Sequence, residues 1–146
     1  MRFMLLVKAS KESEAGTLPT EAQLAEMGRF NEELVNAGMI LAAEGLHSSA
    51  KGARVRFSGR KPTVIPGPFP EPETLVAGFW MLRVDSMEAA VELAKRVPFD
   101  DGEIEIRQVF ETEDFAPSDP TGELRAAESR LRAKADAQQS SPKRPG

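Results

Sequence analysis

The stretch Val76-Ala77-Gly78-Phe79-Trp80-Met81-Leu82-Arg83-Val84 determines the fold of this chain. Successive side chains of a strand point to opposite faces, so apolar residues on both parities predict a strand that is covered on both sides. The run Phe3-Met4-Leu5-Leu6-Val7 has the same character. The sequence therefore predicts a sheet in which two strands each need apolar partners on two faces.

Signals for helices and further strands surround these two runs. The segment Thr20-Glu21-Ala22-Gln23 has the form of a capping box, and a stripe at three- and four-residue spacing follows it up to Gly38. The stripe consists of Leu24, Met27, Asn31, Leu34 and Val35. A second helix is expected from the cap Ser86 to Pro98, and strands are expected over 39–44 and 103–110.

The middle of the chain predicts an edge hairpin and an irregular loop. The segments 54–57 and 61–65 flank the turn signal Ser58-Gly59, and five prolines between Pro62 and Pro72 exclude a helix or a central strand there. The basic residues Lys51, Arg54, Arg56, Arg60 and Lys61 are typical of the charges that keep an edge strand from pairing. An anionic ligand or an acidic partner is the alternative interpretation of these charges.

The order of these elements predicts an α+β fold of the ferredoxin-like split βαβ type with an inserted hairpin. Its two helices cover only one face of the sheet. A second copy of the chain is the economical cover for the other face, so we expect a homodimer whose sheets face each other and enclose a cavity.

The apolar residues divide the chain into a domain over 1–115 and a tail over 116–146. Of the 33 Leu, Ile, Val and Phe residues, 31 precede residue 116, and only Leu124 and Leu131 follow. Asp119 as cap and Pro120 at the first helical position predict an accessory helix to about Ala137. A disordered end is expected from about Ser140.

Composition excludes several classes of site. The 146 residues include no Cys and a single His, which excludes disulfides, cysteine zinc sites and His-rich metal sites. A net charge of -4 and the absence of a P-loop or dinucleotide fingerprint predict no cofactor and no nucleic-acid or membrane partner. No leader or membrane-spanning run is evident, so a cytoplasmic location is expected.

Several short motifs occur in an order that resembles a known family. They are Glu44-Gly45-Leu46-His47, Gly67-Pro68-Phe69, Gly78-Phe79-Trp80 and Val97-Pro98-Phe99. Over about residues 1–111 the chain resembles the YCII-related family, in its DGPF branch. The resemblance implies a dimeric α+β barrel, and relatives include cofactor-free enzymes that act on small ring compounds, such as dehydrochlorinases.

The chain departs from that family at two places. Pro66 stands where the motif that names the branch has Asp, although Glu71 matches the acidic residue that usually follows it. Better-studied relatives carry a His on the first helix, and no His lies between Thr20 and Gly38. These departures indicate that the pocket has lost a dyad on which relatives are proposed to depend.

His47 is the candidate for proton transfer, because an imidazole titrates near neutral pH and this one follows a strand on a Gly/Ser bend. Glu44 or Glu71 is the candidate carboxylate that orients the ring, and the Pro66–Glu73 loop is expected to share a pocket with His47. The alternative is a structural His that bonds to the Pro-rich loop.

Phe69 and either Phe79 or Trp80 are expected to line an apolar pocket for a small molecule. Phe79 and Trp80 point to opposite faces, so we expect only one of them to line any one cavity. Core or dimer interface is the alternative location for all three.

Two functions follow from these residues. One is a cofactor-free lyase or isomerase in which His47 moves a proton. The other is a non-catalytic ligand-binding or regulatory domain that has kept the cavity. A His47 that faces a closed cavity beside a carboxylate favours the enzyme, and a His47 that faces solvent favours the binder.

Overall fold

A computed structural model of the chain describes residues 1–140. These residues form two compact units, of which the first is Met1–Val109 and the second begins at Phe110. The division predicted after residue 115 lies inside the second unit. The disordered end that was predicted from about Ser140 falls almost wholly outside the described residues.

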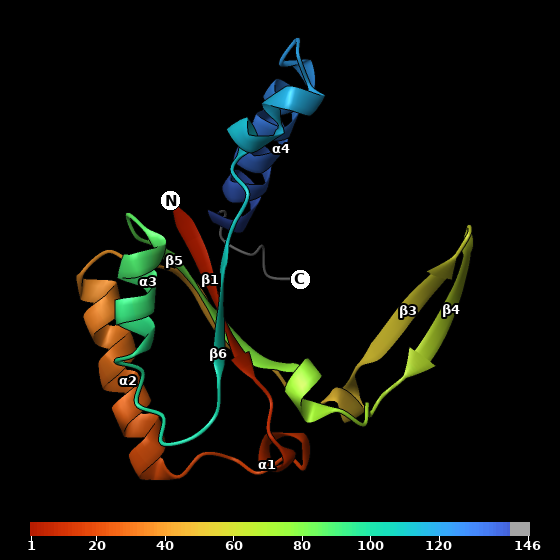
Figure 1. The fold of residues 1–146 in the computed structure, drawn as a ribbon. Helices are drawn as coiled ribbons and strands as arrows, with labels where there is room; N and C mark the ends of the chain where they lie inside the picture. Colours follow the sequence, from red (N-terminus) through yellow and green to blue (C-terminus); the bar gives the residue numbers. More distant parts are fainter. Residues whose placement is uncertain (141–146) are drawn as a thin grey trace. The chain divides into compact units, whose positions relative to one another are not determined.

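The first unit contains a four-stranded antiparallel sheet (Figure 1). Its strands, in spatial order, are β2 (Ile40–Gly45), β5 (Val76–Arg83), β1 (Arg2–Lys8) and β6 (Ile104–Gln108). The two strands that sequence predicted to be covered on both faces are the central pair. The order confirms the predicted ferredoxin-like α+β fold.

Two helices, α2 (Glu21–Asn36) and α3 (Met87–Ala94), pack on one face of this sheet (Figure 1). Each begins at its predicted cap: the Thr20 hydroxyl accepts the Gln23 N–H, and the Ser86 hydroxyl accepts the Ala89 N–H. The shared core consists of Phe3, Leu5, Phe30, Leu34, Trp80, Leu82, Val84, Ala90, Leu93 and Val97. Burial of these side chains stabilises the unit.

The other face of the sheet carries the alternate residues of the same strands. Met4 pairs with Met81, and Leu6 pairs with Phe79, so these four side chains share one face. All four are half-buried. Because α2 and α3 lie on the opposite face, these side chains form an apolar surface that the two helices do not cover, here called the open face.

The predicted hairpin forms from β3 (Ala53–Ser58) and β4 (Lys61–Pro66). It is a separate two-stranded sheet and not an edge of the main one, so the prediction of an edge hairpin was wrong in that respect. In Figure 1 it extends away from the four-stranded sheet. The short 3₁₀ helices η1 (Ser49–Lys51) and η2 (Pro72–Thr74) lie at its two ends along the chain.

A short helix, α1 (Lys11–Glu14), lies in the polar segment that separates β1 from α2. The Ser10 hydroxyl accepts the Ser13 N–H, and the Ser13 hydroxyl accepts the Ser10 N–H. The sequence analysis missed this helix because four residues are too few for apolar periodicity to show.

The second unit contains η3 (Thr112–Ser118) and α4 (Glu123–Ser140). The helix begins after Pro120, not at it, which corrects the prediction of Pro120 as its first residue. Asp119 still caps it from a turn further away, because its carboxylate accepts the N–H of Arg125 at 2.9 Å and of Leu124 at 3.4 Å. None of the helices within residues 1–140 combines the length and apolar character needed to cross a bilayer.

Asp119→Asn is expected to destabilise α4 and to remove a pH dependence. The N–H of Arg125 is the main cause that holds the pKa of Asp119 below its ordinary value, against the opposing effect of burial. A lowered carboxyl pKa contributes stability that is complete above about pH 4 and is lost as the pH falls further. Far-UV circular dichroism from pH 7 to pH 2.5 measures this loss. In Asp119→Asn this acid-dependent loss should shrink, whereas Asp136→Asn on the same helix should retain it.

Candidate functional site

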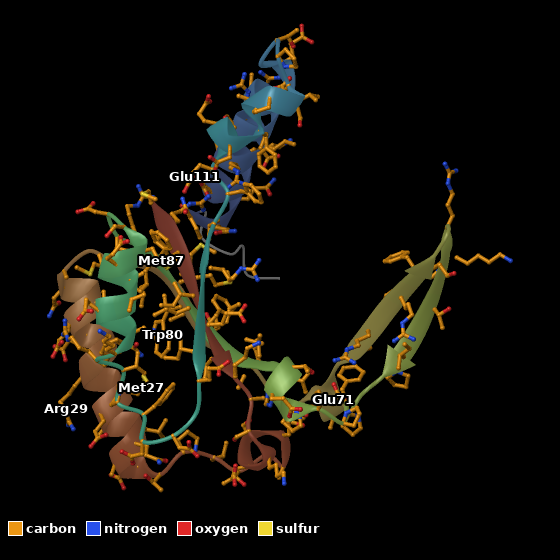
Figure 2. All side chains as sticks on the ribbon, viewed as in Figure 1. Met27, Arg29, Glu71, Trp80, Met87 and Glu111 are labelled. Carbon is orange, nitrogen blue, oxygen red and sulfur yellow. The ribbon has the colours of Figure 1, made fainter. Side chains whose placement is uncertain are left out.

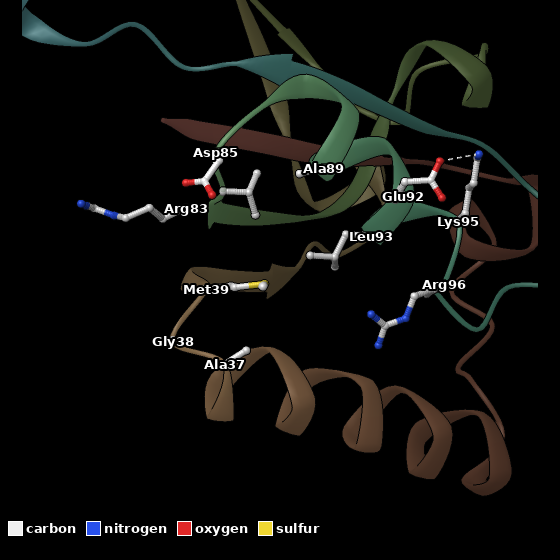
Figure 3. Close-up of a pocket in the computed structure, with 11 residues that line it drawn as sticks. Ala37, Gly38, Met39, Arg83, Asp85, Ala89, Glu92, Leu93, Lys95 and Arg96 are labelled. Atoms are coloured by element: carbon white, nitrogen blue, oxygen red, sulfur yellow. Dashed lines mark hydrogen bonds and ion pairs between the residues drawn. The ribbon is translucent and has the colours of Figure 1, made fainter.

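Two hollows border the sheet of the first unit. The larger, of about 620 Å³, lies between the α2–β2 turn and α3 (Figure 3). Three of its charged residues are already paired: Lys95 and Glu92 with each other at 2.7 Å, and Arg96 with Glu33. It contains no aromatic side chain and none of the residues predicted for a site.

The smaller hollow, of about 290 Å³, holds three of the six predicted site residues. We call it the Trp80 pocket. Its walls come from β1, α2, β2, β5 and the segment after α3. They are formed by Val7, Met27, Asn31, Ala43, Glu44, Gly45, Ala77, Gly78, Phe79, Trp80 and Phe99.

Trp80 forms the aromatic wall of this pocket and is only 5% exposed. Its ring meets Phe30 edge-on, with centroids 5.8 Å apart, and Phe99 at 6.4 Å. Figure 2 shows Trp80 and Met27 in the space between α2 and the sheet, while Arg29 points away from it. Trp80 is therefore the member of the Phe79–Trp80 pair that packs under the helices.

Asn31 supplies the polar group on the helix side. Its Oδ1 accepts a hydrogen bond from Trp80 Nε1 at 2.8 Å. Because the carbonyl oxygen accepts this bond, the Nδ2 amide nitrogen presents its two N–H donors. Within residues 1–140 neither donor forms a hydrogen bond. An acceptor group in the pocket is the partner that these donors favour.

Glu44 and Phe79 pair across β2 and β5 at the end of the sheet. Next to them Gly45 pairs with Gly78, and a Cβ at Gly78 would lie 3.0 Å from the Glu44 carbonyl oxygen. Both glycines border the pocket, and so do Phe79 and Trp80. The register places the side chains of Phe79 and Trp80 on opposite faces of the sheet, as predicted.

His47 follows β2 by two residues and is exposed. Within residues 1–140 it forms no hydrogen bond or ion pair with Glu44 or with Glu71. It is also absent from the residues that line either hollow.

The bend after His47 is joined to the Pro-rich loop through Ser49. The Ser49 hydroxyl accepts the Phe69 N–H at 2.9 Å and donates a hydrogen bond to Glu14, and the Gly67 N–H donates to the Gly52 carbonyl at 2.9 Å. The two hydrogen bonds from Ser49, first from its side chain and then from its backbone N–H, lower the pKa of Glu14. We call this set of contacts the Ser49 junction.

Phe69 lies at this junction, and neither Phe69 nor Glu71 borders the Trp80 pocket. The Arg54 guanidinium lies 3.8 Å from the centre of the Phe69 ring, a cation–π contact. Glu71 is exposed beside the base of the hairpin (Figure 2), and its carbonyl accepts the Thr74 hydroxyl at 2.7 Å. The pocket thus includes Glu44, Phe79 and Trp80, whereas Phe69 is bonded to Ser49 in the bend after His47 and Glu71 lies outside both hollows.

Neither Asn31 nor Phe99 was predicted as a site residue, although Phe99 belongs to one of the motifs that resemble the family. Asn31 was included in the apolar stripe of the first helix, and a polar residue at such a position was the available signal. Within residues 1–140 no group of three or more His, Cys, Asp or Glu side chains is arranged to hold a metal ion.

Comparison with known proteins gives a family and similar solved structures. The YCII-related domain matches residues 1–113. One similar solved structure is that of 5-chloro-2-hydroxyhydroquinone dehydrochlorinase from Burkholderia phenoliruptrix AC1100 in complex with 2,5-dihydroxybenzoquinone. It is 13% identical, with a TM-score of 0.46, over 78% of this chain and 98% of that one. No curated protein matches the chain. Because the domain match spans more than half of its length, the chain belongs to the YCII-related family.

Proposed function

We propose that this protein binds a small ring compound with an oxygen substituent in the Trp80 pocket. The observation that carries the proposal is an aromatic wall beside an amide whose orientation is fixed. Ligand pockets are typically apolar with a few placed polar groups, and range over about 300–1,000 Å³. At about 290 Å³ the Trp80 pocket suits a molecule of one substituted ring.

Asn31 would orient such a ring. The Nδ2 donors of Asn31 suit a carbonyl or ionised hydroxyl oxygen, because Oδ1 is held by Trp80. The proposed ligand therefore carries an acceptor oxygen on its ring.

Catalysis is the second candidate: a cofactor-free lyase or isomerase in which His47 moves a proton and Glu44 or Glu71 orients its ring. One observation favours it, because His47 has no partner within residues 1–140 and lies three residues beyond Glu44. His47 is exposed and lies outside the pocket. Of the two functions, this position favours binding without catalysis.

Asn31→Asp is expected to weaken binding of hydroxylated or carbonyl-bearing ring compounds about tenfold. The carboxylate retains an acceptor for Trp80 but removes both donors and repels an anionic oxygen. Thermal shift and titration by NMR on a panel of phenols, quinones and ring carboxylates measure the change. Asn36→Asp, at the exposed end of the same helix, makes the same chemical change and should bind as the wild type does.

The same titrations separate the two functions. His47→Ala should bind the compounds with unchanged affinity; if any compound is converted, that conversion should be lost. If wild type and Asn31→Asp bound every compound with equal affinity, the proposal that the ligand binds in the Trp80 pocket would be wrong. Conversion that survives in His47→Ala would contradict the proton-transfer role of His47.

The partner that the open face favours is a second copy of the chain. Met4, Leu6, Phe79 and Met81 form an apolar surface on which α2 and α3 do not pack. A homodimer that pairs two such surfaces buries them. The cytoplasmic location expected from the sequence is also part of our proposal.

A further inference from the structure

The β3–β4 hairpin has one apolar face and one basic face. Directly paired residues of an antiparallel ribbon share a face, so Val55 with Val64 and Phe57 with Pro62 lie on one side. Arg54, opposite Ile65, and Arg56, opposite Thr63, lie on the other side. We call residues Ala53–Pro66 the arm.

The apolar face of the arm is exposed. Phe57 is 71% exposed, Val64 65% and Val55 52%. An isolated two-stranded ribbon is only marginally stable in water, and a contiguous exposed apolar surface marks an interaction site. The arm therefore has the properties of a segment that is covered by another molecule.

The charge of the arm suits a second copy of this chain. Between Gly45 and Pro70 the sequence has five basic residues and no acidic one. The rest of the first unit has eight basic and sixteen acidic residues. The remainder of a second copy is thus complementary to the arm, and Glu44 lies on its open face, where it pairs with Phe79.

The base of the arm is fixed by the Ser49 junction. The Gly67 N–H is bonded to the Gly52 carbonyl, and Arg54 lies on the Phe69 ring. A segment that is ordered before association loses less entropy when it binds.

We propose that the arm packs on a second copy of the chain, with Val55, Phe57 and Val64 buried in the interface that the two open faces form. The basic face lies on the other side of the ribbon, where its charge is attracted by the net negative charge of that copy. This inference rests on the proposed homodimer, and it makes the arm a part of that interface.

The double variant Phe57→Ser/Val64→Ser is expected to raise the dissociation constant of the homodimer at least about tenfold. Each dimer has two arms, and the variant removes the apolar contacts of both. Sedimentation equilibrium measures that constant. Leu18→Ser, which removes an 84% exposed leucine outside the arm, is the matched control and should leave it unchanged. Far-UV circular dichroism checks that all variants are folded.

Cross-linking tests the contact without removing it. Because the chain has no Cys, Phe57→Cys provides a unique point for a maleimide photo-cross-linker. In a mixture of ¹⁴N- and ¹⁵N-labelled protein, we expect mixed-isotope cross-links from position 57 to β1, β2 or β5. Cross-links that join residues of one isotope only would overturn the proposal.

The outcomes separate this inference from the proposals on which it depends. A wild-type monomer overturns both the homodimer and the arm contact but leaves ligand binding to be judged by titration. A stable dimer whose constant does not change in the arm variant overturns the arm contact alone. If the arm variant dimerises normally but loses binding to anionic vesicles or to oligo-dT, the arm serves a membrane or a nucleic acid and the proposal is wrong.

Discussion

Gly67→Ala is expected to lower the free energy of unfolding of the first unit by about 3 kcal/mol, or to release the Pro-rich loop from the Ser49 junction. A Cβ at this position would lie 1.7 Å from the Ser49 carbonyl oxygen and 2.7 Å from its carbonyl carbon. Both atoms belong to the backbone, so no side-chain rotation relieves the overlap. The loop, the bend after His47, or both have to move.

Urea denaturation followed by circular dichroism measures the change. Gly28→Ala is the matched control: the same substitution on α2, where a Cβ would meet nothing within 4 Å. Alanine in a helix interior is favoured over glycine, so this variant should be more stable by about 0.5–1 kcal/mol. Two Gly→Ala variants of one protein are thus expected to shift stability in opposite directions. A Gly67→Ala protein as stable as wild type would show that the loop is not seated on Ser49.

The junction also shows where prediction from sequence ends. The prolines identified the loop, but its partner Ser49 lies 20 residues from Phe69 and about as far from Gly67. Nothing local indicates that a serine hydroxyl accepts the Phe69 N–H or donates to Glu14. Contacts of this kind depend on how distant segments meet.

The main sheet was predictable because its evidence is local. Caps at Thr20 and Ser86, together with helical spacing, marked the two helices, and apolar runs marked the central strands. Parity alone left the facing of Phe79 and Trp80 open, because both are apolar and adjacent. The structure assigns Trp80 to the helix side through its contacts with Phe30 and Asn31.

Trp80→Ala is expected to have the largest effect of any single change discussed here, a loss of about 3–5 kcal/mol. The indole joins α2 to the centre of the sheet through the Phe30 ring and the Asn31 side chain, and its removal leaves a cavity in the core. Trp80→Phe keeps an aromatic ring but removes the hydrogen bond. It should cost about 1–2 kcal/mol, because Asn31 borders the pocket and water can replace its lost donor.

Phe79→Ala is the control for the face of the sheet. It truncates the aromatic residue next to Trp80 on the same strand, but on the open face. In the monomer its cost should be smaller than that of Trp80→Ala, because the side chain is half-buried there. Its main effect should appear as a weaker homodimer, so both variants need to be unfolded at several protein concentrations. Circular dichroism is the suitable probe, because Trp80 is the only Trp in a chain without Tyr. That same fact makes Trp80 fluorescence a direct reporter of pocket occupancy in the wild type. If Trp80→Ala and Phe79→Ala were equally destabilising at low concentration, the assignment of Trp80 to the core would be wrong.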